Sequence, residues 1–337
     1  MQTNGSAKIM TLDEVFKDDD LKTHLGKKVK ELKEAVVRAE TPPFPRVLMM
    51  EISNICNHKC TFCAITSMSR PKQYIKPETF KRVVAEAYEL GAREISMVGG
   101  AEPLANKQLE EYISFCRDIG YEYIYITSNA TLADAARWKR ILDAGVHSIK
   151  LSINGGDPES YLAVHGRDGF EKAIESVRII SEYRKKLDRK IYLGVSFVET
   201  AGNVGTFEKL RDLIEPYVDE ILRSQPYNPS GQRPDQPPDL VTFVDGLCYQ
   251  PFSRAHVSRE GYLRTCCSDY ENDLAVEDLA NLSLSEAWVS SRFKNLRHKH
   301  LENGKNKESL KGLLCHRCMY GGEDDYQSLN PDLSSRA

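Results

Sequence analysis

The sequence lacks the features that would direct it to a membrane, a secretory route or a nucleic acid. It has no apolar run of about eighteen residues, the length that a helix needs to span a bilayer. Its N-terminus has no apolar core of the kind found in secretory signals. Its net charge is only −3, so no basic field favours nucleic acid. We therefore expect a cytoplasmic protein that binds neither membranes nor nucleic acids.

Cysteine is sparse, with nine residues in a chain of 337, and it is unevenly placed. In a reducing compartment, such cysteines are more often metal ligands or buried apolar side chains than disulfides. Cys116 shares a helical apolar face with Tyr112 and Ile113, which predicts a buried structural role. The others form a tight front set and a spread back set: Cys56, Cys60 and Cys63, then Cys248, Cys266, Cys267, Cys315 and Cys318.

The middle of the chain alternates between short apolar runs and amphipathic stretches. The apolar runs have the length of buried strands: 47–52, 95–98, 123–126, 149–153, 192–198 and 221–222. The amphipathic stretches are expected to be helices: around 80–90, 109–119, 138–142 and 173–180. This alternation predicts an α/β fold with a parallel sheet, and six units are too few for a complete eight-fold barrel. We therefore expect a partial (β/α)6 barrel with its chemistry at the C-terminal ends of the strands.

The flanking segments break this alternation. Residues 1–45 are expected to be an N-terminal extension containing an amphipathic helix. Prolines mark a linker at 226–246, between a barrel at 46–225 and a small α+β domain at 247–320. Residues 321–337 would then form a tail.

Within the C-terminal domain, the sequence predicts a hairpin around 256–263. It also predicts one helix, opened by a capping box of Ser283 and Glu286, that holds Trp288, Phe293 and Leu296.

Two charged segments are expected to be exposed. Arg70, Lys72 and Lys76 follow the front cysteines and could meet an anionic substrate, but a solvated loop is favoured. The charged residues 297–300 are expected to be an exposed helix end.

The front cysteines directly follow the first predicted strand. Soft thiolates select zinc or iron–sulfur clusters. Structural zinc takes four ligands, whereas this loop supplies three thiolates, and His58 between them is awkwardly placed to be the fourth. A four-iron cluster held by three cysteines instead leaves one iron open to a cofactor or substrate.

The segment Cys56-Asn-His-Lys-Cys60-Thr-Phe-Cys63 resembles the CxxxCxΦC loop of the radical S-adenosylmethionine (SAM) superfamily. In that family the open iron of a [4Fe–4S] cluster chelates SAM. An electron from the cluster cleaves SAM to methionine and a 5′-deoxyadenosyl radical, which abstracts a substrate hydrogen. The resemblance implies that Cys56, Cys60 and Cys63 are cluster ligands, that Phe62 lies near the adenine, and that a flavodoxin or ferredoxin-type protein donates the electron.

Three later segments resemble further motifs of that family, each at a predicted strand end. Residues 97–104 resemble the GGEP segment, from which they depart at Ala101. Residues 127–131 are similar to the TNG segment, with Ala130 in place of glycine, and 151–155 resemble its S-x-D/N segment. The implied SAM contacts, including one after the fifth strand, are Gly99, Gly100, Glu102, Ser128, Asn129, Ser152, Asn154 and Val198.

The back cysteines have the layout of a second site. Four thiolates from two separated places can hold an iron–sulfur cluster or a zinc ion. Residues 248–318 resemble the Twitch or SPASM-type domain of 2-deoxy-scyllo-inosamine dehydrogenase-like and pyranoside epimerase-like members of the superfamily. That resemblance implies one auxiliary [4Fe–4S] cluster, held by Cys248, Cys266, Cys315 and Cys318. Cys267 could replace Cys266, be a spare buried thiol, or donate a hydrogen atom to a substrate radical.

A fully ligated auxiliary cluster has no free iron for a substrate, so electron transfer is its expected task. The leading hypothesis is oxidation of a hydroxyl on a sugar, aminocyclitol or nucleoside, with that cluster taking the electron. Three alternatives stay open: a radical epimerase of a sugar-like substrate with Cys267 as hydrogen donor, a peptide-modifying maturase, and a non-catalytic zinc-binding interaction protein.

Overall fold

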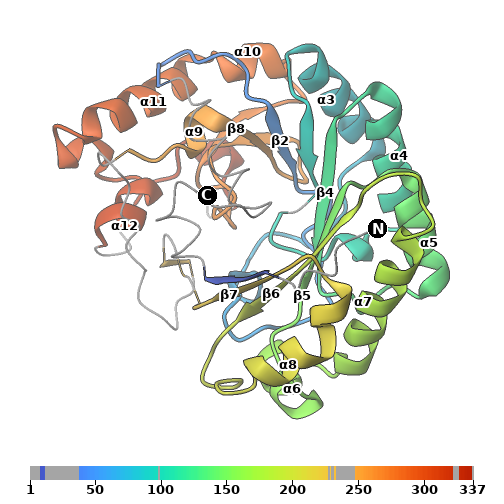
Figure 1. Ribbon diagram of the computed structural model, residues 1–337. Coiled ribbons are helices and arrows are strands. Elements are labelled where there is room, and N and C mark those ends of the chain that lie inside the picture. The colour runs from blue at the N-terminus through green and yellow to red at the C-terminus, as the bar shows by residue number, and fades with distance from the viewer. Residues whose placement is uncertain are drawn as a thin grey trace.

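A ten-stranded sheet organises the part of the chain that the structure describes (Figure 1). The computed structural model describes residues 8–11, 38–97, 99–226, 228, 231–232, 247–321 and 326–335. The strand order is β1-β7-β6-β5-β4-β3-β2-β8-β9-β10. The strands are β1 (Lys8–Thr11), β2 (Val47–Met50), β3 (Glu94–Ser96), β4 (Tyr123–Ser128), β5 (Ser148–Ser152), β6 (Tyr192–Val198), β7 (Glu220–Ser224), β8 (Arg254–Val257), β9 (Tyr262–Arg264) and β10 (Ala275–Asp278).

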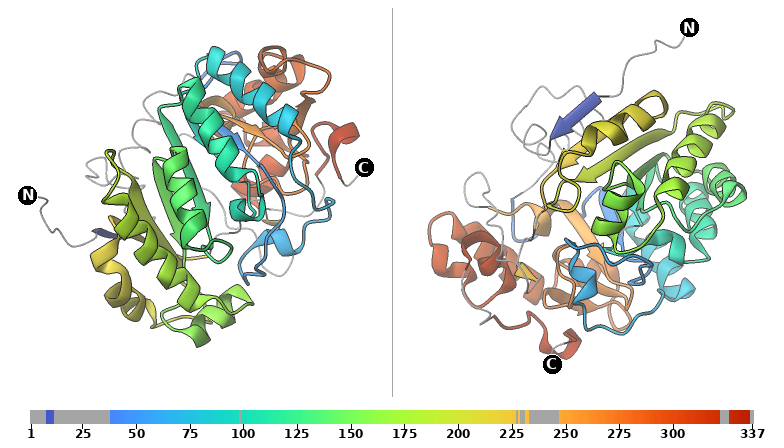
Figure 2. Two further views of the ribbon diagram at one scale, coloured as in Figure 1. Left: turned by 90° about the vertical axis from the view of Figure 1, so that its right-hand side faces the viewer. Right: turned by 90° about the horizontal axis from the view of Figure 1, so that it is seen from below.

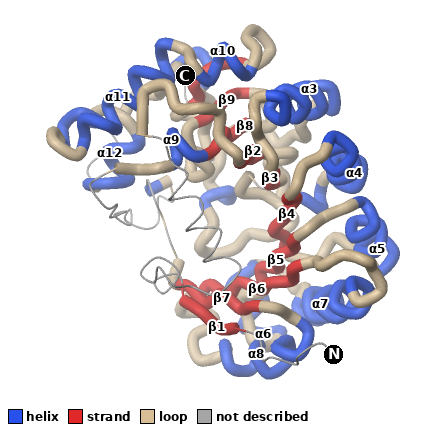
Figure 3. Tube along the Cα trace, turned by 45° about the horizontal axis from the view of Figure 1, so that its top comes forward, coloured by secondary structure: helices blue, strands red, loops and turns tan. Residues whose placement is uncertain are grey.

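Strands β2 to β7 confirm the six predicted strands, and each pairs in parallel with the next. The four predicted helices are also confirmed, and two shorter helices follow β5 and β6. In chain order the six are α3 (Pro77–Glu89), α4 (Leu109–Ile119), α5 (Ala135–Ala144), α6 (Pro158–His165), α7 (Phe170–Arg184) and α8 (Phe207–Ile214). Figure 3 shows the strands in an arc with α3, α4, α5 and α7 along its outer side, which is the partial barrel that the alternation predicted.

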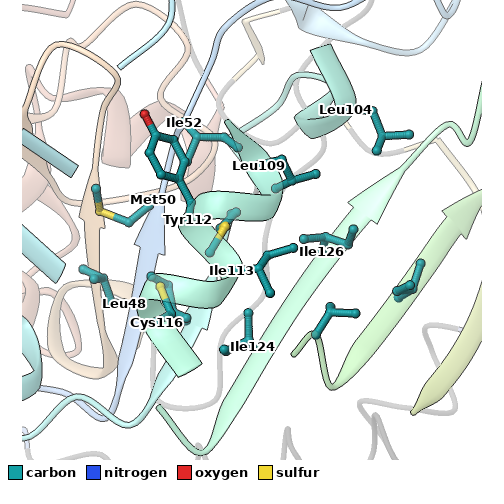
Figure 4. Close-up of a cluster of buried hydrophobic side chains, with 14 of the residues drawn as sticks. Leu48, Met50, Ile52, Leu104, Leu109, Tyr112, Ile113, Cys116, Ile124 and Ile126 are labelled. Carbon is teal, nitrogen blue, oxygen red and sulfur yellow. The ribbon is translucent and has the colours of Figure 1, made fainter. Parts of the chain in front are cut away.

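The core between the helices and the sheet is apolar and closed. Tyr112, Ile113 and Cys116 of α4 pack toward Ile124 and Ile126 of β4, and all five are at most 1% exposed (Figure 4). Residues at alternate positions on a strand face opposite sides of a sheet, so Tyr123 and Tyr125 face the inside of the barrel. The burial of Cys116 in this apolar core confirms its predicted structural role.

The C-terminal segment extends the barrel sheet. Strand β8 pairs in parallel with β2, the first barrel strand, while β9 pairs antiparallel with both β8 and β10. This confirms the predicted hairpin and joins the small α+β domain to the barrel through backbone hydrogen bonds. At the opposite edge, β1 pairs in parallel with β7. The two views of Figure 2 show the C-terminal elements at the other end of the molecule from α8.

The predicted single helix near the C-terminus is wrong, because two helices occupy that stretch. The capping box of Ser283 and Glu286 is confirmed and opens α10 (Leu284–Trp288). The side chain of Ser290 then accepts a hydrogen bond from the amide of Phe293, and so caps the start of α11 (Ser291–Asn303). The domain also contains α9 (Gln250–Ser253) and α12 (Leu314–Tyr320).

Five short 3-10 helices complete the described elements: η1 (Ala64–Thr66), η2 (Pro103–Ala105), η3 (Glu215–Tyr217), η6 (Lys307–Leu310) and η7 (Pro331–Leu333). The amphipathic helix expected within 1–45 and most of the linker at 226–246 lie outside the described residues. No helix in the described ranges is long and apolar enough to cross a membrane.

The expected exposure of residues 297–300 is wrong for two of the four. Arg297 is fully buried, with its guanidinium 4.0 Å from the ring centroid of Trp288 and 3.6 Å from that of Phe293. Its Nη1 also donates to the carbonyl of Trp288. His300 is 1% exposed. A long cationic side chain can satisfy its charge on aromatic faces and carbonyls, which a charge pattern in the sequence does not reveal.

The expected exposure of Arg70 is wrong for a related reason, because it lies in a buried ion-pair network (the Arg70 network: Glu51, Arg70, Arg259, Glu260 and Arg264). Arg70 donates through Nη2 to Glu51 Oε1 at 2.8 Å and through Nη1 to Glu260 Oε2 at 2.8 Å. The side chains of Arg70 and Glu51 are each 1% exposed. Glu51 directly follows β2 and Glu260 lies in the β8–β9 turn, so the network ties the loop after the front cysteines to both parts of the sheet.

We predict that Arg70→Met lowers the free energy of unfolding by about 3 kcal/mol or more, because it leaves two carboxylates in a buried site without their main partner. Urea titration measures this loss. Lys81→Ala is the control, since Lys81 and Glu111 form an exposed pair and its loss should cost less than about 1 kcal/mol. Equal losses in the two variants would contradict a structural role for the network.

Candidate functional site

The front cysteines lie in the loop after β2, at the edge of the sheet where the parallel strands end. The C-terminal end of α6 holds this loop through backbone hydrogen bonds. The amides of Lys59 and Thr61 donate to the carbonyls of His165 and Val164, at 3.1 and 2.9 Å. Gly166 ends α6 with φ +66°, and a β-carbon there would lie 2.9 Å from the Lys59 carbonyl oxygen. Helix α6, which the sequence did not predict, therefore sets the path of the loop around Cys60.

The three front thiols are half-buried and close enough to influence one another. Burial raises the pKa of Cys56 to about 11, and Glu102 and Cys63 raise it further. Burial also raises the pKa of Cys60, with further contributions from Cys63 and Cys56. Without a positive partner the thiolates are thus disfavoured, and a bound metal supplies that partner.

His58 does not complete a ligand set with these thiols. Its Nε2 lies 3.4 Å from the hydroxyl of Tyr161, and burial lowers its pKa to about 4. Among the described residues, no group of three or more His, Cys, Asp or Glu side chains could hold a single metal ion. A four-iron cluster binds each thiolate through a different iron, so its ligands do not need to converge on one point.

Glu102 connects the ends of two strands beside the cysteine loop. It is 2% exposed, and its carboxylate accepts hydrogen bonds from the amide of Leu104, the hydroxyl of Ser128 and the amide of Asn129, at 3.0, 2.7 and 2.7 Å. Asn129 then donates through Nδ2 to Asn57 Oδ1 at 2.8 Å. Burial raises the pKa of Glu102 to about 7, against these hydrogen bonds. The structure thus brings three predicted SAM contacts together next to Cys56.

The glycines after β3 have structural reasons that the sequence did not reveal. A β-carbon on Gly99 would lie 2.4 Å from the Glu51 β-carbon, so this position must lack a side chain. Gly100 has φ +86° and faces the ring of Tyr270. Ala130, which replaces the glycine of the motif, has φ +68°, a left-handed conformation that glycine adopts without strain. Each of the two turns therefore contains one residue in a left-handed backbone conformation.

The ends of β5 and β6 are joined through Asn154. The side-chain Oδ1 of Asn154 accepts from the backbone amide of Val198 at 2.7 Å. The backbone amide of Asn154 donates to His165 Nε2 at 3.0 Å. The hydroxyl of Ser196 donates to that of Ser152 at 3.4 Å. These contacts hold the last predicted SAM residues at the edge that carries the front cysteines. Phe62 is half-buried in the cysteine loop.

The back cysteines surround a cavity. It encloses about 420 Å³ of empty space, including open solvent at its mouth, and its lining includes Cys248, Cys266, Cys315, Cys318 and His300. Neither ring nitrogen of His300 has a hydrogen-bond partner in the described part of the chain, although the residue is 1% exposed. Orphaned buried nitrogens beside four thiols fit a site that holds a further group.

Cys267 is not among the residues that line this cavity. Its charge contributes to raising the pKa of Tyr125, which faces the barrel interior, and also that of Cys248 in the back set. Its hydrogen bond with Cys266, together with Arg254 and Arg264, lowers the pKa of the Cys267 thiol to about 6, although burial opposes this. Of these two neighbouring cysteines, Cys266 therefore lines the cavity and Cys267 does not.

Tyr270 lies between the two sites and was missed in the sequence. Burial raises the pKa of its phenol, and the charges of Cys63, Cys267 and Cys266 raise it further. Its ring also contacts Gly100 of the loop after β3. Cysteines of both sets, about two hundred residues apart in sequence, therefore lie near enough to Tyr270 for their charges to raise its pKa.

Comparison with known proteins matches two regions of the chain to known families. A model of the radical SAM superfamily matches residues 50–214, and a model of an iron–sulfur cluster-binding domain, SPASM, matches residues 248–319. The probable GTP 3′,8-cyclase of Sulfurisphaera tokodaii is 26% identical over 175 residues, which cover 52% of this chain and 54% of that protein. The PqqA peptide cyclase of Bradyrhizobium diazoefficiens is 27% identical over 183 residues, or 54% and 45% of the two chains. This chain spans about half the length of these curated relatives.

Solved structures share the fold at low sequence identity. BtrN in complex with AdoMet and 2-DOIA has a TM-score of 0.53 at 15% identity, covering 84% of this chain and 97% of that one. SuiB of Streptococcus suis, bound to its precursor peptide SuiA, has a TM-score of 0.60 at 16% identity, covering 81% and 70%. The anSMEcpe structure with bound AdoMet has a TM-score of 0.59 at 16% identity, covering 85% and 90%.

The raised pKa of Glu102 predicts a pH dependence. The folded chain holds the Glu102 proton up to about pH 7, whereas the unfolded chain releases it near the ordinary value of 4.5. The contribution of Glu102 to stability therefore falls as the pH rises from about 4.5 to about 7. Urea titrations at several pH values should show wild type losing stability relative to Glu102→Gln across this window. A constant difference between the two would contradict the shift.

Proposed function

Because the chain belongs to the radical SAM superfamily and carries a SPASM-type iron–sulfur domain, we propose that it oxidises a hydroxyl group of a small molecule. Its cofactors are SAM, a [4Fe–4S] cluster that binds SAM, and an auxiliary iron–sulfur cluster bound by the C-terminal domain. When bound, the SAM-binding cluster supplies the electron that cleaves SAM, and the auxiliary cluster accepts the electron that the substrate releases. We assign the barrel to residues 46–225 and the auxiliary domain to 247–320.

Our assignment gives the front cluster to Cys56, Cys60 and Cys63, which fit it because three mutually close thiols lie on one loop. SAM would then meet Gly99, Gly100 and Glu102 through its amino group, with Ser128, Asn129, Ser152 and Asn154 around its ribose and methionine carboxylate. Phe62 and Val198 would line the adenine. Glu102 suits a cationic partner, because a nearby positive charge would offset the burial that raises its pKa to about 7.

The observation that carries the proposed reaction is the closed set of thiols around the back cavity. Cys248, Cys266, Cys315 and Cys318 can ligate every iron of one auxiliary cluster, which leaves no iron for a substrate and favours electron transfer. The 5′-deoxyadenosyl radical would take a hydrogen atom from the carbinol carbon of the substrate and become 5′-deoxyadenosine. The substrate radical would then lose the hydroxyl proton and one electron, and leave as a carbonyl compound.

The substrate class rests on supporting evidence. The BtrN structure, which holds AdoMet and 2-DOIA, is matched over 97% of its length, and a probable GTP 3′,8-cyclase is among the curated relatives. We therefore favour a sugar, aminocyclitol or nucleoside over a peptide. Low-potential clusters also need a reducing compartment, so we propose a cytoplasmic location and a flavodoxin or ferredoxin-type donor.

A second candidate is epimerisation, with Cys267 returning a hydrogen atom to the substrate radical. The position of Cys267 outside the lining of the back cavity favours it, because this thiol is then not needed as a cluster ligand. Dehydrogenation remains the main proposal, because the four thiols around the back cavity can ligate a whole auxiliary cluster and so favour electron transfer.

We predict that anaerobic protein holds about eight iron atoms, and that replacing Cys56, Cys60 and Cys63 by alanine removes about half of them. That variant should form no 5′-deoxyadenosine. The pair Cys315→Ala and Cys318→Ala should also lose about half of the iron but still cleave SAM without making oxidised product. Cys116→Ala is the control and should keep all of the iron. Zinc without sulfide in wild type would support the interaction-protein alternative instead.

The choice between the two reactions is tested in heavy water. A dehydrogenase should release an oxidised product without solvent deuterium at the reacting carbon, and Cys267→Ala should still form it. Deuterium at an inverted carbon, lost in Cys267→Ala, would overturn the dehydrogenase proposal and support the epimerase. Mass spectrometry of the product gives both readouts.

A further inference from the structure

The ring of His165 has a fixed hydrogen-bond pattern beside one front cysteine. His165 is the last residue of α6 and is 1% exposed. Its Nε2 lies 3.0 Å from the amide nitrogen of Asn154. An amide N–H can only donate, so Nε2 must carry the lone pair, and the hydrogen of the neutral ring is on Nδ1. That Nδ1 lies 3.3 Å from Cys60 Sγ.

The surroundings of the ring hold it in this orientation. Tyr161 stacks on it with ring centroids 4.0 Å apart and an angle of 20°, and the edge of His58 meets it at 5.2 Å. The backbone of Cys60 is held by the same helix end, since Lys59 and Thr61 on either side of it donate to α6 carbonyls. Both partners of the contact are therefore in place before any cofactor binds.

We propose that His165 is a positioning residue whose Nδ1–H donates a hydrogen bond to the Cys60 sulfur and raises the reduction potential of the SAM-binding cluster. The inference rests on the proposed role of Cys60 as a cluster ligand. A donor aimed at a ligating sulfur stabilises the reduced cluster, which carries more negative charge. The cluster would then accept an electron from a protein reductant more easily.

The hydrogen bond from His165 reaches the sulfur of Cys60. Cys56 Sγ instead lies 3.4 Å from the backbone amide of His58 and 3.9 Å from Asn129 Nδ2. The Cys60 contact comes from a side chain, so it can be removed by substitution without altering the backbone of the loop. It also lies outside the CxxxCxΦC segment, more than one hundred residues along the chain.

The test is an EPR-monitored redox titration of the anaerobic holoenzyme, in which the SAM-binding cluster is recognised by the change of its signal when SAM is added. His165→Phe keeps a ring to stack on Tyr161 but removes the donor, and its midpoint potential should shift to a more negative value. His165→Asn places an amide Nδ2 near the position of the ring Nδ1 and should restore part of the shift. Tyr161→Phe, which loses only the hydroxyl near His58, should match wild type.

An unchanged potential in His165→Phe with full iron content would overturn the proposal. A second measurement covers the case in which that variant does not assemble its cluster. In protein whose histidines carry ¹⁵N in the imidazole ring only, and which carries Cys315→Ala and Cys318→Ala, pulsed EPR of the reduced cluster should detect a nitrogen coupling that disappears in His165→Asn. Absence of that coupling would also overturn the proposal. If wild type shows no SAM-responsive cluster at all, the proposed function itself fails, before any variant is made.

Discussion

The buried pair of Arg70 and Glu51 is the interaction on which the arrangement of both sites depends. Glu51 directly follows the first barrel strand, and Arg70 also binds Glu260 in the hairpin of the C-terminal domain. Charges this deeply buried are costly unless each has a partner, so neither side can move without leaving the other uncompensated. Ser69, next to Arg70, reinforces the junction by donating to the Glu271 carboxylate from its amide and its hydroxyl, at 2.7 and 2.8 Å. The loop after the front cysteines is thereby fixed between barrel and C-terminal domain.

This junction also holds in place the aromatic residue Tyr270, whose pKa both cysteine sets raise. The carbonyl of Tyr270 accepts from Arg70 Nε at 2.6 Å, so the same arginine that binds the barrel also holds this aromatic residue.

Much of the fold follows from the sequence because its signals are periodic. The six barrel strands and the helices with one apolar face, such as α4, needed only alternation and glycine stops. Helix α6 was missed because its eight residues carry almost no apolar face, and its start depends on a local box between Asp157 and Ser160. The break between α10 and α11 was missed because a second serine cap, Ser290, follows the first within a few residues.

The site divides in the same way. Cysteine spacing and short motifs identified residues that the structure gathers at one edge of the sheet, since parallel strands bring their ends together. What spacing could not reveal is which distant residue meets which: His165 against Cys60, His300 among the back thiols, and Tyr270 between the sets. Charge patterns misled for Arg70 and Arg297, because a cation in a sequence looks the same whether water or a buried partner satisfies it.

The parallel pairing of β8 with β2 has a consequence for biosynthesis. The first barrel strand has one neighbour, β3, soon after it emerges, but its other edge stays open until the chain has been translated as far as β8. At ordinary rates of translation that interval is on the order of ten seconds. An unpaired strand edge is a template for unwanted association, so the nascent barrel depends on its own C-terminal hairpin, or on a chaperone before it, to close that edge.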